Sequence, residues 1–365
     1  MFADPLLALA LLLLFLYAHG VAHRLGHTLA GSFASMRAER SPVAERALDR
    51  IRLILTYPLP GRLCGRHTIA VHPAAGDLSR ATWFALMGGP IADLLTFLLM
   101  LSAARYFPSL PLFAACGLAG ILFLVNGWPR RIRYITTDGA LLEAMNRGGA
   151  AAGRLAALAA LEGAVRDGQL PRSWDRRLLV RATTSPDSSP EATCADLFAY
   201  YYALDQGDLE SARAALERLA MAGLDRPRCL RALVAIEAQF LEARTGVALI
   251  RVPQHGRTRW WHALALLRDQ QLALWRRRHA PGPWARTRAA WLHNAGLDTE
   301  AVQAARAGIV AIMRHQPDGP TAARHALVER EWLRVFIKNV SAQQEHAVPR
   351  DSDRDREALS VFSHE

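Results

Sequence analysis

The chain has 365 residues, of which 51% are hydrophobic, and its formal net charge at pH 7 is +11. Almost all of the positive charge comes from arginine, because Lys338 is the only lysine. The chain lacks the pattern of interleaved aromatic and basic residues that marks nucleic-acid folds, so we expect a membrane, and no nucleic acid, as the partner of this charge. Its cysteines are widely spaced without a C-x-x-C pair, and they indicate neither a zinc ribbon nor a disulfide framework.

Three apolar segments are long enough to cross a bilayer, since a transmembrane helix needs about 20 mostly apolar residues. They run from Pro5 to about Ala30, from Trp83 to about Tyr106 and from Leu110 to about Trp128. No basic residue precedes the apolar run of the first segment, which distinguishes it from a secretory signal peptide. We therefore predict a retained, polytopic membrane domain.

The distribution of arginines predicts the orientation of these spans. The arginines around them are Arg37, Arg40, Arg46, Arg50, Arg52, Arg62, Arg66 and Arg80 before the second span, Arg105 between the second and third, and Arg130, Arg131 and Arg133 after the third. Positive charge accumulates in cytoplasmic loops, so we expect the N-terminus outside and the C-terminal part in the cytoplasm. The arginine-rich composition indicates a bacterium, and hence its inner membrane.

The segment "GRHTIAVHP", residues 65–73, alternates and is β-branched enough to form a short strand. A strand with an open edge cannot lie against lipid, so this one must be paired or covered by protein. A small re-entrant or membrane-surface β element is therefore expected in the first loop.

Histidines form a stripe in the first span. His19, His23 and His27 are four residues apart, so they lie on one face of a helix. An imidazole in a membrane helix is costly unless it faces a polar interior, and such residues usually mark a functional site. The alternatives are contacts with lipid headgroups or hydrogen bonds to a neighbouring helix.

The stretch "HRLGHTLAG" closely resembles the H-E-x-x-H helix of the site-2 proteases, which are intramembrane zinc metalloproteases. Two further stretches are similar to motifs of that family. "GGPIADLL", Gly88 to Leu95, looks like its G-P-x-x-N stretch, with Gly89 and Pro90 in place and Asp93 where asparagine is usual. "NGWPRRIRYITTDGALL" looks like its N-x-x-P segment, with Asn126 and Pro129, leading to the D-G pair.

The resemblance covers residues 1–146 and implies a zinc site. It assigns His23, His27 and Asp138 as metal ligands, with a fourth position left for water, and Gly139 as the small residue after the aspartate. His19 is an additional candidate ligand. Without the resemblance, the preferred interpretation of Asp138 would be the N-cap of a helix, because "TTDGALLEAM" has the pattern of a helix start.

Arg24 occupies the position of the family's catalytic glutamate. In an H-E-x-x-H protease the glutamate takes a proton from the metal-bound water, whereas a guanidinium stays protonated and cannot act as a base. Loss of a general base typically costs a factor of ~10² to 10⁴ in rate, and the added positive charge disfavours the metal. The site could therefore be without zinc, and we expect a pseudoenzyme.

Residues 147–340 are rich in alanine, leucine and arginine and predict a cytoplasmic α-helical domain. "YYALDQGDLESARAALERLAMAG" and "LHNAGLDTEAVQAARAGIVAIM" look like tetratricopeptide-like helical hairpins, with Gly207 and Ala212 matching Gly296 and Ala301. Their offset does not fit the period of 34 residues, so any repeat array is irregular. The segment 257–280 either lies on the membrane or packs its tryptophans in the core. Residues 341–365 form a polar tail that we expect to be disordered.

These features predict a mainly α protein and leave three alternative functions. The first is a non-proteolytic membrane protein that binds a membrane-protein or peptide partner. The second is an active intramembrane zinc peptidase with another base. The third is a membrane anchor for a helical scaffold.

Overall fold

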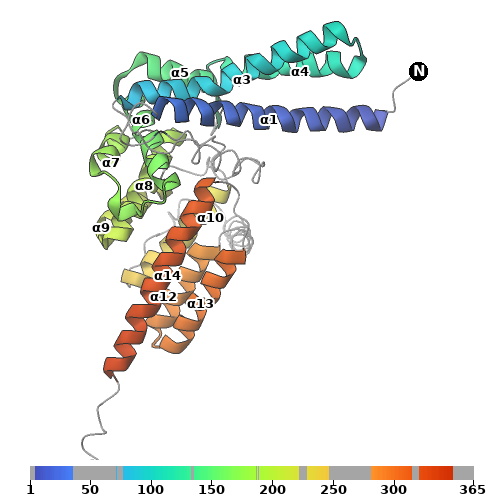
Figure 1. The fold of residues 1–365 in the computed structure, drawn as a ribbon. Coiled ribbons are helices and arrows are strands. Elements are labelled where there is room, and N and C mark those ends of the chain that lie inside the picture. The colour runs from blue at the N-terminus through green and yellow to red at the C-terminus, as the bar shows by residue number, and fades with distance from the viewer. Residues whose placement is uncertain are drawn as a thin grey trace, which may run out of the picture.

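The computed structural model describes residues 5–35, 71, 77–132, 135–185, 187, 189–221, 228–245, 281–314 and 320–347. These residues are mainly helical, as the sequence predicts (Figure 1). The expected strand at residues 65–73 lies outside them except for Val71. That residue is in no strand, and its N–H donates to the Ala159 carbonyl at 2.9 Å.

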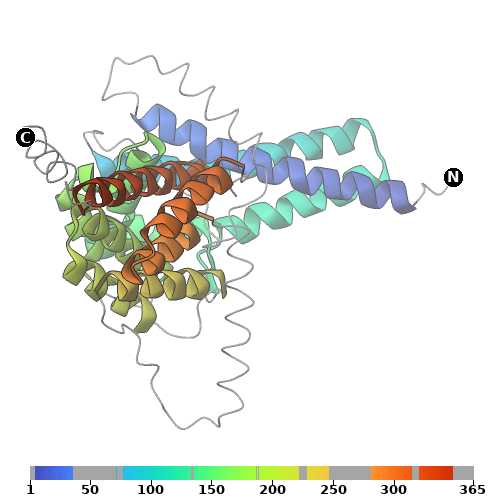
Figure 2. The same ribbon diagram turned by 90° about the horizontal axis from the view of Figure 1, so that it is seen from below.

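Three helices are long and apolar enough to cross a membrane. They are α1 (Pro5–Ser35), α3 (Leu78–Tyr106) and α4 (Leu110–Gly127), and they match the predicted spans. The three lie side by side, with the N-terminal end of α1 and the α3–α4 connection at the same end of the bundle (Figures 1 and 2). Large apolar side chains along them are exposed in the protein alone, as expected for helices that face lipid.

Local sequence explains where these helices begin and bend. The Asp77 side chain accepts a hydrogen bond from the Arg80 N–H and caps α3. Pro111 stands in the first turn of α4, where a missing N–H costs nothing. Pro90 lies inside α3, and because it has no N–H it opens the helical hydrogen-bond ladder near the histidines of α1.

A short antiparallel hairpin follows α4. Its strands, β1 (Arg131–Ile132) and β2 (Ile135–Thr136), pair Arg131 with Thr136 and Ile132 with Ile135. The sequence analysis predicted a β element only in the first loop, at residues 65–73, and did not predict the hairpin at residues 131–136. The hairpin returns the chain from the end of α4 to α5 (Asp138–Arg147).

Gly148, with a positive φ of 71°, ends α5 and caps the start of α6. The helices that follow are α6 (Gly149–Arg166), the 3₁₀ turn η1 (Pro171–Ser173), α7 (Arg176–Thr183), α8 (Pro190–Gln206), α9 (Leu209–Met221), α10 (Arg228–Thr245), α12 (Pro281–Asn294), α13 (Asp298–Arg314) and α14 (Pro320–Ala347). Helix α6 packs on α3, so the predicted boundary at residue 147 separates two parts that are in contact.

Both predicted hairpins are present. Helices α8 and α9 join at Gly207, and α12 and α13 join near Gly296, and both glycines have left-handed backbones with φ of 77° and 75°. Ala212 and Ala301, at matching positions after these turns, are fully buried. The two hairpins thus share a local layout.

A buried charged cluster joins the later helices. Arg286 on α12 contacts the carboxylates of Glu237 on α10 and Glu329 on α14 at 2.9 to 3.1 Å, and Tyr200 of α8 donates to Glu237 at 2.5 Å. Helix α14 continues to Ala347, so the helical part extends past the predicted boundary at residue 341. The segment 257–280, for which both a membrane-surface and a core placement were open, lies outside the described residues, as does the rest of the predicted tail.

Candidate metal centre

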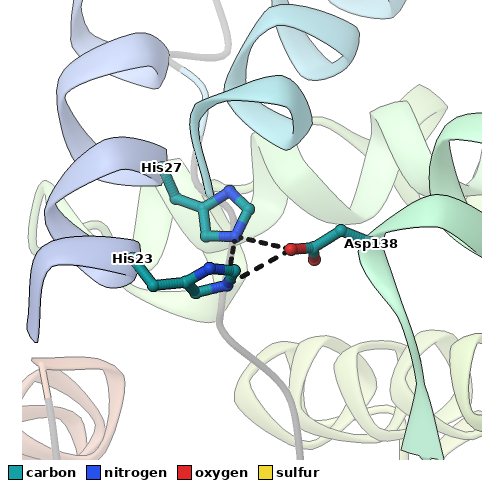
Figure 3. A group of neighbouring side chains, drawn as sticks. All are labelled: His23, His27 and Asp138. Atoms are coloured by element: carbon teal, nitrogen blue, oxygen red, sulfur yellow. Dashed lines mark hydrogen bonds and ion pairs between the residues drawn. The ribbon is translucent and has the colours of Figure 1, made fainter. Parts of the chain in front are cut away.

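Three side chains from distant parts of the chain converge at one end of the bundle. His23 and His27 lie one turn apart on α1, and Asp138 is the first residue of α5 (Figure 3). Their ligand atoms lie within 4.8 Å of one another, and all three residues are buried. The structure therefore brings together the three residues that the sequence assigned as ligands.

The hydrogen bonds of His27 determine which ring nitrogen carries its proton. Its Nδ1 lies 2.8 Å from the carbonyl oxygen of Ala85 on α3, and the Gly89 N–H approaches the same nitrogen at a longer 3.3 Å, so the contact with Ala85 is the closer one. A carbonyl can only accept, so we assign the proton of the neutral imidazole to Nδ1. Its Nε2 is then left with a lone pair that points toward Asp138.

His23 is oriented in the same way by a side chain. Its Nδ1 lies 2.9 Å from Oδ1 of Asp93 on α3, and the carboxylate accepts the proton. The Nε2 of His23 consequently also presents a lone pair. Metal-binding histidines characteristically donate their other nitrogen to a carboxylate or a backbone carbonyl, and both arrangements occur here.

Three acceptor atoms therefore face one another. The two Nε2 atoms are 3.1 Å apart, and each lies 3.2 Å from Oδ2 of Asp138. Without a cation among them, these lone pairs repel unless a ring carries a proton on Nε2 and donates it to Asp138. Zinc with bonds of 2.0–2.1 Å in a tetrahedral arrangement separates its ligand atoms by about 3.3 Å. The distances match one face of such a site, and the donor set fits a divalent transition metal.

The carboxylate of Asp138 is not used to cap α5, because the preceding residue, Thr137, does so. The Thr137 side chain accepts a hydrogen bond from the Ala140 N–H, so the N-cap is Thr137 and the Asp138 carboxylate is free to face the histidines. Burial raises the pKa of Asp138, but when the rings carry protons on Nε2 their hydrogen bonds and positive charge outweigh this and hold the pKa below its ordinary value; a bound cation would act in the same direction. The carboxylate stays ionised, which is the form that binds metal.

Glycines let the helices approach this centre. A Cβ atom on Gly89 would overlap Nε2 of His27 and would lie 2.6 Å from Cε1 of His23, so only glycine leaves space for both rings. A Cβ on Gly139 would overlap the carbonyl oxygen of Gly127 at the end of α4. Steric crowding therefore explains why glycine stands beside Pro90 and beside Asp138.

Arg24 does not reach the three ligands. Its Nε donates to the carbonyl of Gly20 at 3.0 Å, one turn toward the N-terminus on the same helix. Among the residues that the structure describes, no ion pair joins Arg24 to Asp93 or Asp138. The side chain in the position of the catalytic glutamate therefore turns away from the centre.

Two of the remaining sequence candidates, His19 and Asn126, contact a second carboxylate, that of Asp93. His19 Nε2 is 3.1 Å from Oδ1 of Asp93, and His19 is not among the three converging ligands. Asn126 donates from Nδ2 to Oδ2 of Asp93 at 2.9 Å. Pro129 is exposed beyond the end of α4 and contributes no ligand atom.

Of the two groups that orient the imidazoles, sequence reasoning missed the Ala85 carbonyl, and it named Asp93 as a motif residue without its contact to His23. The Ala85 carbonyl is a backbone group, and no residue type marks it. The carboxylate of Asp93 had a signal, since it stands where the resembled family has asparagine, but its partner His23 becomes evident only from the packing of α1 on α3.

Comparison with known proteins adds no relative: no protein-family model, curated protein or solved structure matches this chain. Its function is therefore inferred from the geometry of the centre and from the motifs in the sequence.

Proposed function

We propose that this chain is a membrane protein that binds a zinc ion through His23, His27 and Asp138 and holds a membrane-protein or peptide partner without cleaving it. When bound, zinc supplies a Lewis acid and a fixed double positive charge at the end of the span bundle. The fold is proposed to be that of a site-2 protease, on the three motifs that the sequence shares with that family.

The position of Arg24 carries the non-proteolytic part of the proposal. Hydrolysis needs a base within about 3 Å of the metal-bound water, and the residue at the expected position is a cation bonded to the Gly20 carbonyl. Among the described residues, the other carboxylate beside these side chains, Asp93, accepts hydrogen bonds from His23 and Asn126 and has no exposed surface. It lies on the Nδ1 side of the His23 ring, away from the metal side.

The cavity beside α5 supports a binding role. It has a volume of about 660 Å³ and is lined by Pro129 and Arg131 of the hairpin region, by one face of α5 and by the first turn of α6. Two arginines, Arg131 and Arg147, line this cavity together with Glu143. The α5 residues that line the cavity, Ala140, Glu143, Ala144 and Arg147, lie on the face of the helix opposite Asp138, and none of the three proposed ligands lines it. A partner bound there would therefore contact α5 from the side away from the metal centre.

The proposed location is the inner membrane of a bacterium, with the N-terminus outside. The arginines of the first loop and those after α4 then lie in the cytoplasm, as the positive-inside rule requires. His23 and His27 lie in the half of α1 that is distant from its N-terminus, so the centre would face the cytoplasmic side. The later helices would present their surface to a cytoplasmic partner.

Metal analysis combined with one substitution tests the proposal. The purified full chain in lipid nanodiscs should contain about one zinc ion, and His23→Ala and His27→Ala should each abolish this. Wild type should leave a panel of co-reconstituted single-span reporter helices intact. Arg24→Glu restores a base at the motif position, and cleavage of a reporter by this variant alone would support the assignment strongly.

Other results would favour the alternative functions. Reporter cleavage by wild type, lost with His27→Ala, would overturn the non-proteolytic role and establish an active peptidase. A wild-type chain that takes up no zinc from a buffered excess would contradict the metal site and favour a simple anchor for the helical domain. Arg24→Gln is the matched control for Arg24→Glu, because it removes the charge without supplying a base.

A further inference from the structure

Asp93 is a buried carboxylate in the middle of a helix that is long and apolar enough to cross the membrane. Its side chain has no exposed surface, and α3 extends well beyond it in both directions. An ionised carboxylate at such a place is unfavourable unless specific partners compensate for the lost water. Its partners should therefore indicate its purpose.

The partners of Asp93 are all polar and come from two other spans. Oδ1 lies 2.9 Å from His23 Nδ1 and 3.1 Å from His19 Nε2, both on α1. Oδ2 accepts a hydrogen bond of 2.9 Å from Asn126 near the end of α4. Asp93 thus joins all three spans at one point, directly behind the ring of a metal ligand.

The two imidazoles of the centre are held by groups of different kinds. His27 donates to a neutral backbone carbonyl, that of Ala85, whereas His23 donates to a carboxylate. A carboxylate behind a ligating imidazole fixes the ring and makes its free nitrogen a better donor to the metal. A substitution can therefore change the support of His23 and leave the support of His27 in place.

The negative charge of Asp93 also completes the charge balance of the proposed centre with a divalent ion. Two neutral imidazoles and the Asp138 carboxylate contribute one negative charge toward a divalent ion, which leaves one positive charge in a dry environment. The carboxylate of Asp93 provides the second negative charge, and it lies one imidazole ring away from the metal position. Opposite charges at this range interact more strongly in a buried site than in water.

We propose that Asp93 is the positioning residue of the metal centre: it orients His23 toward the metal and neutralises the bound dication, while His19 and Asn126 hold its carboxylate. Asp93 contacts His23 but is not one of the three residues proposed to bind the metal. The inference rests on the proposed function, because it requires that His23, His27 and Asp138 bind a metal.

The test measures metal affinity and ligand geometry in the purified full chain in nanodiscs. Zinc affinity is determined by competition with a chelator, and cobalt(II), as a probe ion, reports the coordination through its visible absorption. Asp93→Ala should weaken zinc binding by ~10- to 100-fold. Asp93→Asn should give an intermediate loss, since its amide oxygen still accepts from His23 but carries no charge.

Thr96→Val is the matched control. Thr96 lies on α3 one turn after Asp93 and is partly buried, and its hydroxyl donates to the carbonyl of Ala92 on its own helix. This variant should bind zinc as wild type does. The cobalt spectrum should change in Asp93→Ala and stay unchanged in Thr96→Val, which separates a loss of orientation from a general loosening of the helix.

The outcomes distinguish this inference from the proposed function. Wild type that binds no zinc overturns the metal site and with it the role of Asp93. Wild-type zinc affinity and an unchanged cobalt spectrum in Asp93→Ala overturn the positioning role alone. If Asp93→Ala elutes as an aggregate, the isosteric Asp93→Asn variant decides: zinc affinity equal to that of wild type counts against the inference, and weaker affinity in a monodisperse sample supports it.

Discussion

Gly26 of α1 and Gly88 of α3 lie backbone against backbone, so that a Cβ atom on either one would overlap the carbonyl oxygen of the other. Small residues at a helix crossing allow such close approach in a membrane, where dispersion and not the hydrophobic effect holds helices together. The crossing is next to the metal centre, since His27 and Gly89 are the neighbours of these glycines in the chain. The centre therefore depends on the spacing of α1 and α3.

Substitution of Gly88 tests this dependence. A methyl group at Gly88 meets backbone atoms of Gly26, which cannot turn aside, so Gly88→Ala should separate the two helices. We expect loss of zinc binding and a lower thermal unfolding midpoint of the protein in detergent. Gly117→Ala on α4 is the control, because a Cβ there would meet no atom within 4 Å. Equal midpoints in the two variants would contradict the close crossing.

Gly89→Ala should affect the metal more selectively. The added methyl group would occupy the space of the His27 and His23 rings, which are side chains and can rotate away. The helices should then stay in place while the ligand atoms are displaced. We expect zinc content to fall at least ~10-fold with little change in far-UV circular dichroism, and full zinc occupancy in Gly89→Ala would refute the steric role of this glycine.

The sequence was sufficient to predict three helices long and apolar enough to cross a membrane, because about 20 consecutive apolar residues have few alternatives to such a helix. It also predicted His23, His27 and Asp138, although only through motifs that resemble a known family. Helical spacing by itself grouped His19 with the other two histidines, whereas packing assigns His19 to Asp93. The pairing across helices depends on the rotation of α1 against α3, which no local pattern encodes.

The sequence departs from the resembled motifs at two positions, Arg24 and Asp93, and the roles of both could be interpreted only with the structure. Arg24 adds a positive charge where glutamate is usual, and Asp93 adds a negative charge where asparagine is usual. The structure separates them: Arg24 bonds to the Gly20 carbonyl, and Asp93 supports His23. The hairpin at residues 131–136 was missed for another reason, since strands of two residues carry no periodic pattern.

Removal of the metal should lower the stability of the protein. A ligand that binds only the folded state stabilises it by about 2.7 kcal/mol at a free concentration of 100 times its dissociation constant. Dialysis of wild type against a zinc chelator should therefore lower the thermal unfolding midpoint, and added zinc should restore it. The His23→Ala/His27→Ala double variant should show the same midpoint with and without chelator. A chelator effect that persists in this variant would place the metal elsewhere.

The buried cluster of Arg286 should be essential for the later helices. Arg286 stacks on the ring of Phe240, with its guanidinium carbon 4.0 Å from the ring centroid, and its charge is shared by Glu237 and Glu329. Removal of one partner of a buried ion pair costs about 3–5 kcal/mol, because the other charge remains buried without compensation.

Arg286→Met keeps most of the volume of the side chain and should lower the unfolding midpoint of the protein by several degrees, as followed by tryptophan fluorescence. Arg213→Met is the comparison, because Arg213 and Glu217 form an exposed pair on one helix, which is worth about 0.3–0.5 kcal/mol. Similar midpoints for the two variants would show that the buried cluster contributes no more than a surface pair.

The two helical hairpins allow a matched test of their turns. Gly207 and Gly296 have nearly the same positive φ, 77° and 75°, and a Cβ at either position would meet no atom within 4 Å. Alanine therefore fits sterically at both sites but is strained in the left-handed conformation, at a cost of about 1–2 kcal/mol. We expect Gly207→Ala and Gly296→Ala to destabilise the protein by similar amounts. Asparagine tolerates this conformation better, so Gly207→Asn and Gly296→Asn should each recover part of the loss. A loss at one site alone would mean that the two turns, despite their common backbone geometry, are held by different surroundings.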